Sequence, residues 1–301
     1  MIEEELAKSR AGFRGEQSVD YHLQSLAKDK YMVLHDVRLQ NDGSDFFQLD
    51  TLVVSSQFLL IVEIKNITGM LFFDQAFHQL IRTLDGKEEA FPDPIIQIRR
   101  QSDNLEKWLE KHKLPIIPIH SLIVISNPAT LVKTAPQHKE IFKKVIHSAS
   151  LPAKVEEFDE RIYKGVLTRK DSRKLVRYIL KEHVPSNPDY LRQFKVNVSD
   201  VLTGVHCPGC QSLPLAKKRG GWFCSECKVM HHNAHIDSLY DYYLLVDNTI
   251  TNRQLRLFLR LSSASVAYKL LSSLDLPHTG ETRRRKYALS GYPWENLVNT
   301  K

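Results

Sequence analysis

The stretch of sequence that decides the fold of this chain is FLLIVEIK, residues 58–65. Its first part is wholly apolar, which is typical of a β-strand buried on both faces. The run nevertheless ends in Glu63 and Lys65, which are two positions apart and so lie on one face, about 6–7 Å apart along a strand. Because an unpaired buried carboxylate is costly, we expect both groups to open into a cleft or to meet partners.

The preceding apolar run, residues 46–55, contains Asp50. If the two runs pair as a hairpin, Asp50 lies beside Glu63, and two carboxylates and one ammonium group converge. Magnesium prefers oxygen ligands, so Asp50 and Glu63 could hold Mg²⁺ or Mn²⁺, which would polarise a phosphate and lower the pKa of a bound water. Lys65 would orient that water or stabilise charge that develops on the phosphate. The alternative is a salt-bridged strand end, since this spacing alone occurs in many unrelated chains.

The rest of the first half predicts a mixed sheet flanked by helices, an α/β (α+β) fold. A helix is predicted for residues 4–27, with an interruption near Gly12 and Gly15. Strands are predicted at 31–39, 46–55, 58–65, 70–73, around Leu80 and at 119–125. A helix that begins after Pro92 and Pro94 would bury Ile95, Ile98, Leu105, Trp108 and Leu109. Between 130 and 187 the pattern is weaker, apart from a helix over 170–181.

Residues about 10–125 resemble the nuclease-related domain (NERD) family, a branch of the PD-(D/E)xK restriction-endonuclease-like nucleases. The resemblance rests, in chain order, on Gly12-Phe13-Arg14-Gly15-Glu16, His35-Asp36-Val37, Gln48-Leu49-Asp50, Val62-Glu63-Ile64-Lys65-Asn66 with Gly69, and Pro94-Ile95-Ile96-Gln97. It implies a four-stranded central sheet and a metal-dependent nuclease site built from Asp50, Glu63 and Lys65. It also implies an accessory carboxylate at Glu16 and a supporting polar residue at Gln97. For Glu16 the alternative is a surface acid of the first helix, and for Gln97 it is a hydrogen bond at the helix N-terminus.

All four cysteines lie in two Cys-x-x-Cys pairs, Cys207 with Cys210 and Cys224 with Cys227. Each pair can form a knuckle, and a hairpin that turns at residues 217–221 would join the two knuckles into the closed tetrahedral site of structural zinc. The pattern resembles a zinc ribbon; redox-active thiols are the alternative. The nearby histidines at 206, 231, 232 and 235 are interpreted as neighbours of the site or surface residues, because four cysteines already complete it.

The C-terminal region is strongly basic, with eight Lys or Arg against two acids between Arg253 and Lys286. A capping box from Thr251 to Gln254 predicts a helix to Leu261, and Ser262-Ser263 precedes a second helix over 264–274. The second would bury Val266, Leu270, Leu271 and Leu274 and expose Ser265, Tyr268, Lys269 and Ser272. This resembles a helix-turn-helix followed by the basic hairpin of a winged helix. The expected nucleic-acid contacts are Lys269, Arg283, Arg284, Arg285 and Lys286. The alternative is a helical hairpin with a solvated basic tail.

Together these patterns predict a nuclease-related domain over 1–187, a linker over 188–205, a zinc ribbon over 206–232 and a helix-turn-helix-like region over 236–301. No apolar run approaches the ~20 residues needed to cross a bilayer, and the acidic N-terminus is unlike a signal peptide, so we expect a cytoplasmic protein. The function these features favour is a Mg²⁺-dependent deoxyribonuclease with DNA as partner. A non-catalytic DNA-binding or scaffold protein and an RNA-processing enzyme remain open as alternatives.

Overall fold

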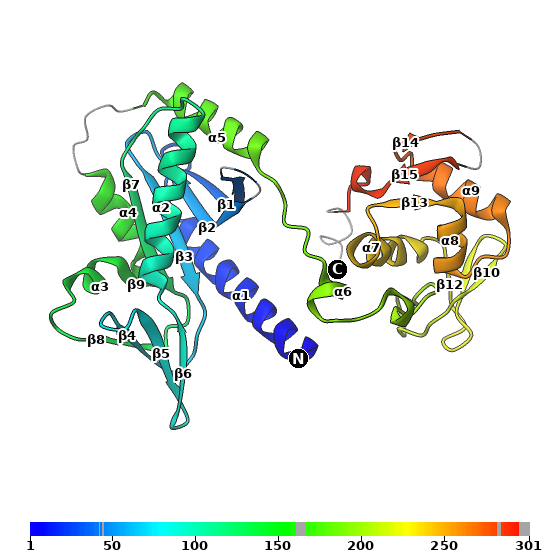
Figure 1. Cartoon of the computed structure of the whole chain (residues 1–301), viewed down its shortest axis with the longest axis horizontal. Coiled ribbons are helices and arrows are strands. Elements are labelled where there is room, and N and C mark those ends of the chain that lie inside the picture. The colour runs from blue at the N-terminus through cyan, green and yellow to red at the C-terminus, as the bar shows by residue number, and fades with distance from the viewer. Residues whose placement is uncertain (42, 44, 161–166, 282–283, 295–301) are drawn as a thin grey trace. The chain divides into compact units, whose positions relative to one another are not determined.

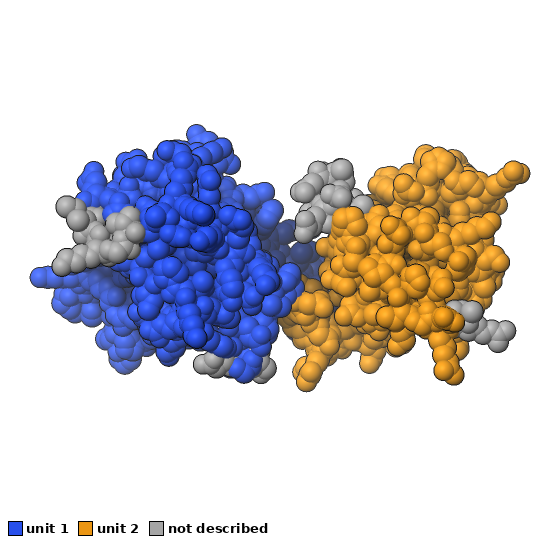
Figure 2. Space-filling model, turned by 90° about the horizontal axis from the view of Figure 1, so that it is seen from above, with its two compact units in different colours: residues 1–186 blue, residues 187–301 orange. Residues whose placement is uncertain are grey.

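The computed structural model describes residues 1–41, 43, 45–160, 167–281 and 284–294. The chain divides into two compact units, residues 1–186 and residues 187–301 (Figure 2). Among the described helices, none combines the length and the apolar character that a membrane crossing requires.

The central sheet of the first unit has five strands, in the order β1 (Met32–Gln40), β2 (Phe46–Val54), β3 (Leu59–Lys65), β7 (Ile119–Ile125) and β9 (Val145–His147). The first three pair antiparallel, whereas β7 runs parallel to both β3 and β9. The strands predicted at 31–39, 46–55, 58–65 and 119–125 are therefore confirmed, and the sheet is mixed as expected. The resemblance implied four central strands; the short edge strand β9 is a fifth.

Helices cover both faces of this sheet (Figure 1). Successive residues of a strand point to opposite faces. Leu59 and Ile61 pack in the cluster that contains α2 (Pro94–Lys111) and α5 (Arg169–Glu182). Leu60 and Val62 pack instead with α1 (Ile2–Leu23) and α4 (Leu151–Asp159). The same alternation directs Glu63 to the face that carries α2.

The first helix, α1, is continuous from Ile2 to Leu23, so the predicted interruption near Gly12 and Gly15 is wrong, as is the predicted end at Ala27. A glycine inside a helix costs only about 1 kcal/mol relative to alanine, which neighbouring helical residues and packing can offset. Gly15 is buried, together with Val19 and Leu23, on the side that faces the sheet.

A second sheet lies next to the N-terminal end of α2, in the order β6 (Lys87–Pro92), β5 (Gln79–Leu84), β4 (Met70–Asp74) and β8 (Leu131–Thr134). Leu71, Phe73 and Leu80 from this sheet share a core with Ile95 and Ile98 of α2. The helix α3 (Lys139–Lys144) contributes Ile141 to the same core. All five residues predicted to form the buried face of α2 are buried.

The second unit contains a small three-stranded sheet, then helices and a second three-stranded sheet (Figure 1). The elements are α6 (Tyr190–Gln193), β10 (Ala216–Lys218), β11 (Gly221–Phe223), β12 (Met230–His231), α7 (His235–Leu245), β13 (Thr249–Thr251), α8 (Asn252–Leu259), α9 (Ala264–Ser273), β14 (His278–Thr279) and β15 (Lys286–Ala288). One hydrophobic core runs through the unit: it includes Cys207, Trp222 and Cys224 as well as Leu255 and Leu271.

The C-terminal helices begin where the sequence predicted. Thr251 and Gln254 form the capping box of α8, and Ser263 caps α9. On α9, Leu271 is buried as expected, but Ala267 takes the other buried position, whereas Val266, Leu270 and Leu274 are only half-buried. The buried line of the helix therefore runs through Ala267 and Leu271, slightly rotated from the predicted one.

Candidate functional site

The register of β2 and β3 brings Asp50 and Glu63 together. Thr51 and Val62 form the last pair of the antiparallel ladder between the two strands, and Asp50 and Glu63 are the residues that come directly after this pair. The Oδ2 atom of Asp50 accepts a hydrogen bond from the backbone N–H of Ile64 at 2.9 Å. The aspartate is thereby fixed beside the end of β3, where the glutamate and the lysine lie.

The Glu63 side chain is only 3% exposed, yet both of its oxygens have donors. Lys65 Nζ donates to Oε1 at 2.6 Å, and Gln97 Nε2 donates to the same oxygen at 2.7 Å. Gln101 Nε2 donates to Oε2 at 2.8 Å. Lys65 also donates to Gln97 Oε1 at 3.1 Å. Because donors on two elements engage both oxygens, this network holds Glu63 in one orientation.

Helix α2 supplies both glutamines from one face, since Gln97 and Gln101 are four residues apart. The start of the helix is set by Asp93, whose side chain accepts from the N–H of Ile95, and by Pro94 in the first turn. Gln101 is buried and was not singled out from the sequence. A polar residue in the middle of an otherwise apolar helix face, one turn after Gln97, was the feature that could have identified it.

Helix α1 brings Glu16 toward the same end of the sheet. A Cβ atom on Gly15 would lie 2.6 Å from Cβ of Asn66, directly after β3, so only glycine permits this approach. Asn66 Nδ2 in turn donates to the carbonyl of Ala11 at 2.7 Å. Burial raises the pKa of Glu16, and the charges of Asp36 and other nearby acids add to the effect. The charge of Glu63 is among these effects on Glu16, and the charge of Glu16 in turn contributes to the raised pKa of Asp50.

The site carries an excess of buried negative charge. Burial, followed by the charge of Glu63, raises the pKa of Asp50 to about 7, although the N–H of Ile64 and the Lys65 ammonium act in the opposite direction. A divalent cation between the carboxylates would relieve this repulsion, and oxygen is the donor that Mg²⁺ and Mn²⁺ take. The residues present thus fit such an ion, with Asp50 and Glu63 as the groups that would hold it and Glu16 nearby.

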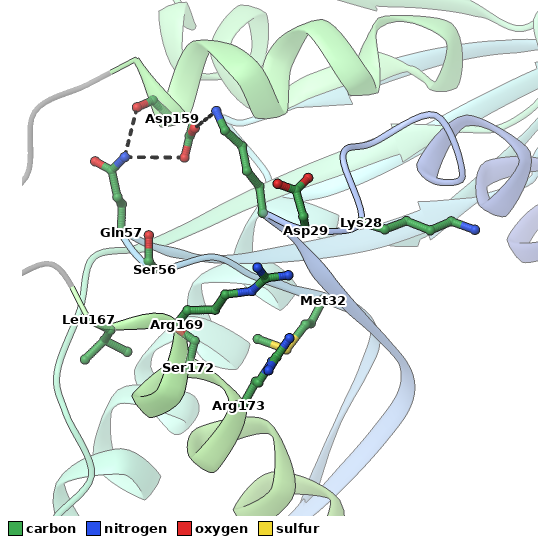
Figure 3. A pocket seen from close by; sticks show the side chains of 11 residues that line it. Lys28, Asp29, Met32, Ser56, Gln57, Asp159, Leu167, Arg169, Ser172 and Arg173 are labelled. Carbon is green, nitrogen blue, oxygen red and sulfur yellow. Dashed lines mark hydrogen bonds and ion pairs between the residues drawn. The ribbon is translucent and has the colours of Figure 1, made fainter.

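The first unit also has a cavity of about 370 Å³ near the turn between β2 and β3 (Figure 3). Its lining includes Gln57, whose side chain donates to the carbonyl of Asp159, and Lys30, which forms an ion pair with Asp159 at 3.0 Å. Gln57 precedes β3, whereas Glu63 lies near the end of that strand, roughly 20 Å away at the rise of an extended chain. The cavity therefore does not include the carboxylate pair.

In the second unit, the four cysteines converge: the Sγ atoms of Cys207, Cys210, Cys224 and Cys227 all lie within 4.8 Å of one another. Cys207 Sγ is 3.6 Å from Cys227 Sγ, and Cys210 Sγ is 3.5 Å from Cys224 Sγ. Four sulfurs at about 2.3 Å from a tetrahedral zinc ion would be about 3.8 Å apart. The predicted hairpin is present as β10 and β11, which pair from Ala216–Phe223 to Lys218–Gly221. The cluster thus has the donor set and nearly the spacing of a closed zinc site.

Polar neighbours surround this cluster, as the sequence predicted for the histidines. His231 Nε2 lies 3.4 Å from Cys207 Sγ, and the Ser212 hydroxyl lies 2.9 Å from Cys224 Sγ. The hydrogen bond from Ser212 lowers the pKa of Cys224 to about 6, whereas burial and the neighbouring thiols raise the pKa of Cys227 to about 12. His235 instead faces the core, where its Nδ1 accepts from Trp222 Nε1 at 3.2 Å.

Of the predicted nucleic-acid contacts that the structure describes, Lys269 lies on α9, Arg284 and Arg285 precede β15, and Lys286 begins that strand. Lys269, Arg284 and Lys286 are exposed, and Arg285 is half-buried. Arg283 lies outside the described residues. As predicted, Ser265, Tyr268 and Ser272 share the exposed side of α9 with Lys269.

Part of the first unit matches the model of a known protein family. Residues 11–126 match the family model of the nuclease-related domain (NERD). This segment contains Glu16, all of β2 and β3, and the two glutamines of α2. The first unit therefore carries a nuclease-related domain with a restriction-endonuclease-like fold. Searches of curated proteins and of solved structures found no match to the chain.

Proposed function

We propose that the first unit is a metal-dependent nuclease that hydrolyses phosphodiester bonds in DNA. The observation that carries this proposal is the convergence of Asp50, Glu63 and Lys65 with two glutamines at one end of the sheet, inside the segment that matches the nuclease-related domain. A salt bridge at a strand end would need neither the half-buried aspartate nor the amides.

Mg²⁺ or Mn²⁺ bound there would supply Lewis acidity toward the phosphate and its attacking water. The residues of the chain have separate roles. Asp50 and Glu63 provide the anionic oxygens, and the amides of Gln97 and Gln101 hold Glu63 in place. Lys65 uses one N–H to bind Glu63 and one to bind Gln97, so one of its three donors remains for a phosphate oxygen on which charge develops.

The second unit supports DNA binding in this proposal. Its cysteine cluster would bind a structural zinc ion, with no open position for chemistry. The order α7, β13, α8, α9, β14, β15, with β15 central in the sheet, resembles that of a winged helix, which supports this part of the proposal. In that arrangement α9 and the basic segment before β15 would contact DNA, with the arginines on phosphates.

The experiment is a cleavage panel with purified full-length protein, with duplex, single-stranded and branched DNA and with RNA, in Mg²⁺, in Mn²⁺ or without a divalent ion. Wild type should cleave DNA only with the metal. Glu63→Gln keeps the size and several hydrogen bonds of the side chain but removes its charge, so it should lose at least about 100-fold in rate, or about 2.7 kcal/mol. Glu106→Gln, an exposed position on α2, is the matched control and should cleave like wild type.

Equal cleavage by wild type and Glu63→Gln would show that this site is not catalytic. Salt-dependent DNA binding without metal-dependent cleavage of any substrate would favour the non-catalytic alternative. Cleavage of RNA alone would assign the same site to RNA processing.

A further inference from the structure

The second unit contains a cavity of about 580 Å³ that is distinct from the cysteine cluster. Three elements form its walls: α8, α9 and the segment that enters β15. The lining residues are Asn252, Arg253, Arg256, Ala264, Tyr268, Arg285 and Tyr287. The sequence pointed to Arg285 as a nucleic-acid contact, but not to Arg253 or Arg256.

The charge in this cavity is one-sided. Three of its lining residues are arginines, and the described lining includes no acidic side chain. Within the described ranges, Arg253, Arg256 and Arg285 form no ion pair, whereas several other basic residues of the chain do. Three guanidinium groups that converge without a counter-ion repel one another, so the cavity favours an anion.

Two donors in the cavity wall lack acceptors. The Nε atoms of Arg256 and Arg285 are buried, and neither has a hydrogen-bond partner among the described residues. Buried donors are almost always satisfied, so such a pair points to a missing acceptor. Contact with the hydroxyl of Tyr287 raises the pKa of Arg285, which keeps its charge in place.

An anion that meets these groups must offer several oxygens, because guanidinium groups bind in a planar fork through two N–H donors. Phosphate has this geometry. Tyr268, which lines the cavity, also belongs to the exposed side of α9, so a phosphate held here would lie beside the surface that α9 presents. We propose that Arg253, Arg256 and Arg285 form a pocket that binds one backbone phosphate of a nucleic-acid strand lying along α9. This inference rests on the DNA-binding part of the proposed function.

The test measures binding of a fluorescein-labelled DNA duplex to zinc-loaded, full-length protein without Mg²⁺, by fluorescence anisotropy at several salt concentrations. Arg256→Gln and Arg285→Gln should each weaken binding about tenfold on every duplex sequence, and the slope of log K against log salt should shrink by about one. Arg192→Gln, an exposed arginine of the same unit outside this cavity, is the matched control and should bind within about twofold of wild type. Zinc content and thermal unfolding verify that each variant is folded. Arg253→Gln, at the exposed third arginine of the cavity, replaces any variant that is not, with the same expected result.

Binding by the folded pocket variants as tight as that of wild type would overturn the pocket and leave DNA binding intact. No DNA binding by wild type would overturn both the pocket and the role of the second unit, while the Glu63 cleavage assay still tests the first unit on its own. Inorganic phosphate serves as a second probe, which tests whether the cavity binds free phosphate instead of a nucleic-acid backbone. If it stabilises wild type but not Arg256→Gln against heat, and both bind DNA equally, the pocket takes free phosphate and the nucleic-acid assignment is overturned.

Discussion

Asp50 is an acid whose ionisation the folded protein opposes. Its pKa is raised from 3.8 to about 7, first by burial and then by Glu63. Between these two pH values the folded state retains a proton that the unfolded chain has lost. The contribution of Asp50 to the free energy of unfolding is therefore most favourable at low pH, falls as pH rises from about 4 to about 7, and then stays low.

Replacing Asp50 with asparagine should remove this penalty, since an asparagine oxygen can still accept from the N–H of Ile64. Without divalent ions we expect Asp50→Asn to be more stable than wild type at about pH 8, and this advantage should shrink by roughly 2 kcal/mol on going to about pH 5. Urea unfolding of both proteins at the two pH values measures this difference in the free energy of unfolding. Mg²⁺ should stabilise wild type more than the variant; an advantage that does not change with pH would contradict the assigned pKa.

Gln101 provides a second test at the level of single residues. Its amide donates to Glu63 Oε2 and to the carbonyl of Gln48, at 2.8 and 3.1 Å. Gln101→Met keeps the length of the side chain but leaves that Glu63 oxygen without this donor, so the single-turnover cleavage rate should fall about tenfold or more. Gln24→Met, at an exposed position of the same unit, should not change the rate. An unchanged rate in Gln101→Met would show that Gln101 only fills space.

The site residues differ in how far the sequence alone could place them. Glu63 and Lys65 are two apart on an unmistakable strand, so their common face follows from strand geometry. The place of Asp50 depends on the register between two strands. Because β3 is buried on both faces, its apolar pattern does not fix that register; the short turn that joins Val54 to Leu59 does. Gln101 acts across the space between a helix and the sheet. Such contacts depend on how the helix packs, which local pattern does not specify.

Among the elements, α1 is held to the sheet by a glycine. The Cβ of an alanine in place of Gly15 would stand 2.6 Å from Asn66 Cβ, a side-chain atom close to the backbone that cannot move far. At Gly12, in the same helix, nothing lies within 4 Å. Substituting alanine at Gly12 changes only the helix propensity, whereas the same substitution at Gly15 also disturbs close packing.

We expect Gly15→Ala to destabilise the first unit by about 1–3 kcal/mol and to slow cleavage, because α1 must move away and take Glu16 with it. Gly12→Ala should stabilise by about 0.5–1 kcal/mol without changing the rate, because alanine is the better helix former. Thermal unfolding and cleavage assays on both variants provide the measurement. Equal stability effects at the two positions would mean that α1 does not need the close approach.

Three strands of the first unit that the sequence did not predict, β6, β8 and β9, lack a readable apolar period. Strand β6 carries Lys87, Glu88 and Glu89, and most of its residues are exposed, so it lacks the apolar alternation of a half-buried strand. Strands β8 and β9 have four and three residues, too few for a period to appear. These edges form because neighbouring strands offer backbone partners, whereas β3 and β7 carry enough buried apolar residues to be predicted directly.

At the scale of the whole molecule, the two units have separate cores of different kinds. The first unit has three hydrophobic clusters that involve its sheets and helices. The second has one, and two of the cysteines, Cys207 and Cys224, are fully buried members of it beside Trp222. The cysteine cluster and the helices α8 and α9 therefore depend on the same core.

Removing zinc should for this reason unfold the second unit as a whole and leave the first intact. Structural zinc contributes an apparent 10–16 kcal/mol, about as much as the total stability of an ordinary domain, so the short strands around the cysteines cannot compensate for its loss. Calorimetry of the full chain should show two transitions, and a zinc chelator or Cys224→Ser should abolish the transition of the second unit only. Metal analysis should find one zinc per chain, and DNA binding should be lost together with that transition. If α8 and α9 kept their structure without zinc, as judged by helical circular dichroism and unchanged DNA affinity, the single core would not couple them to the metal.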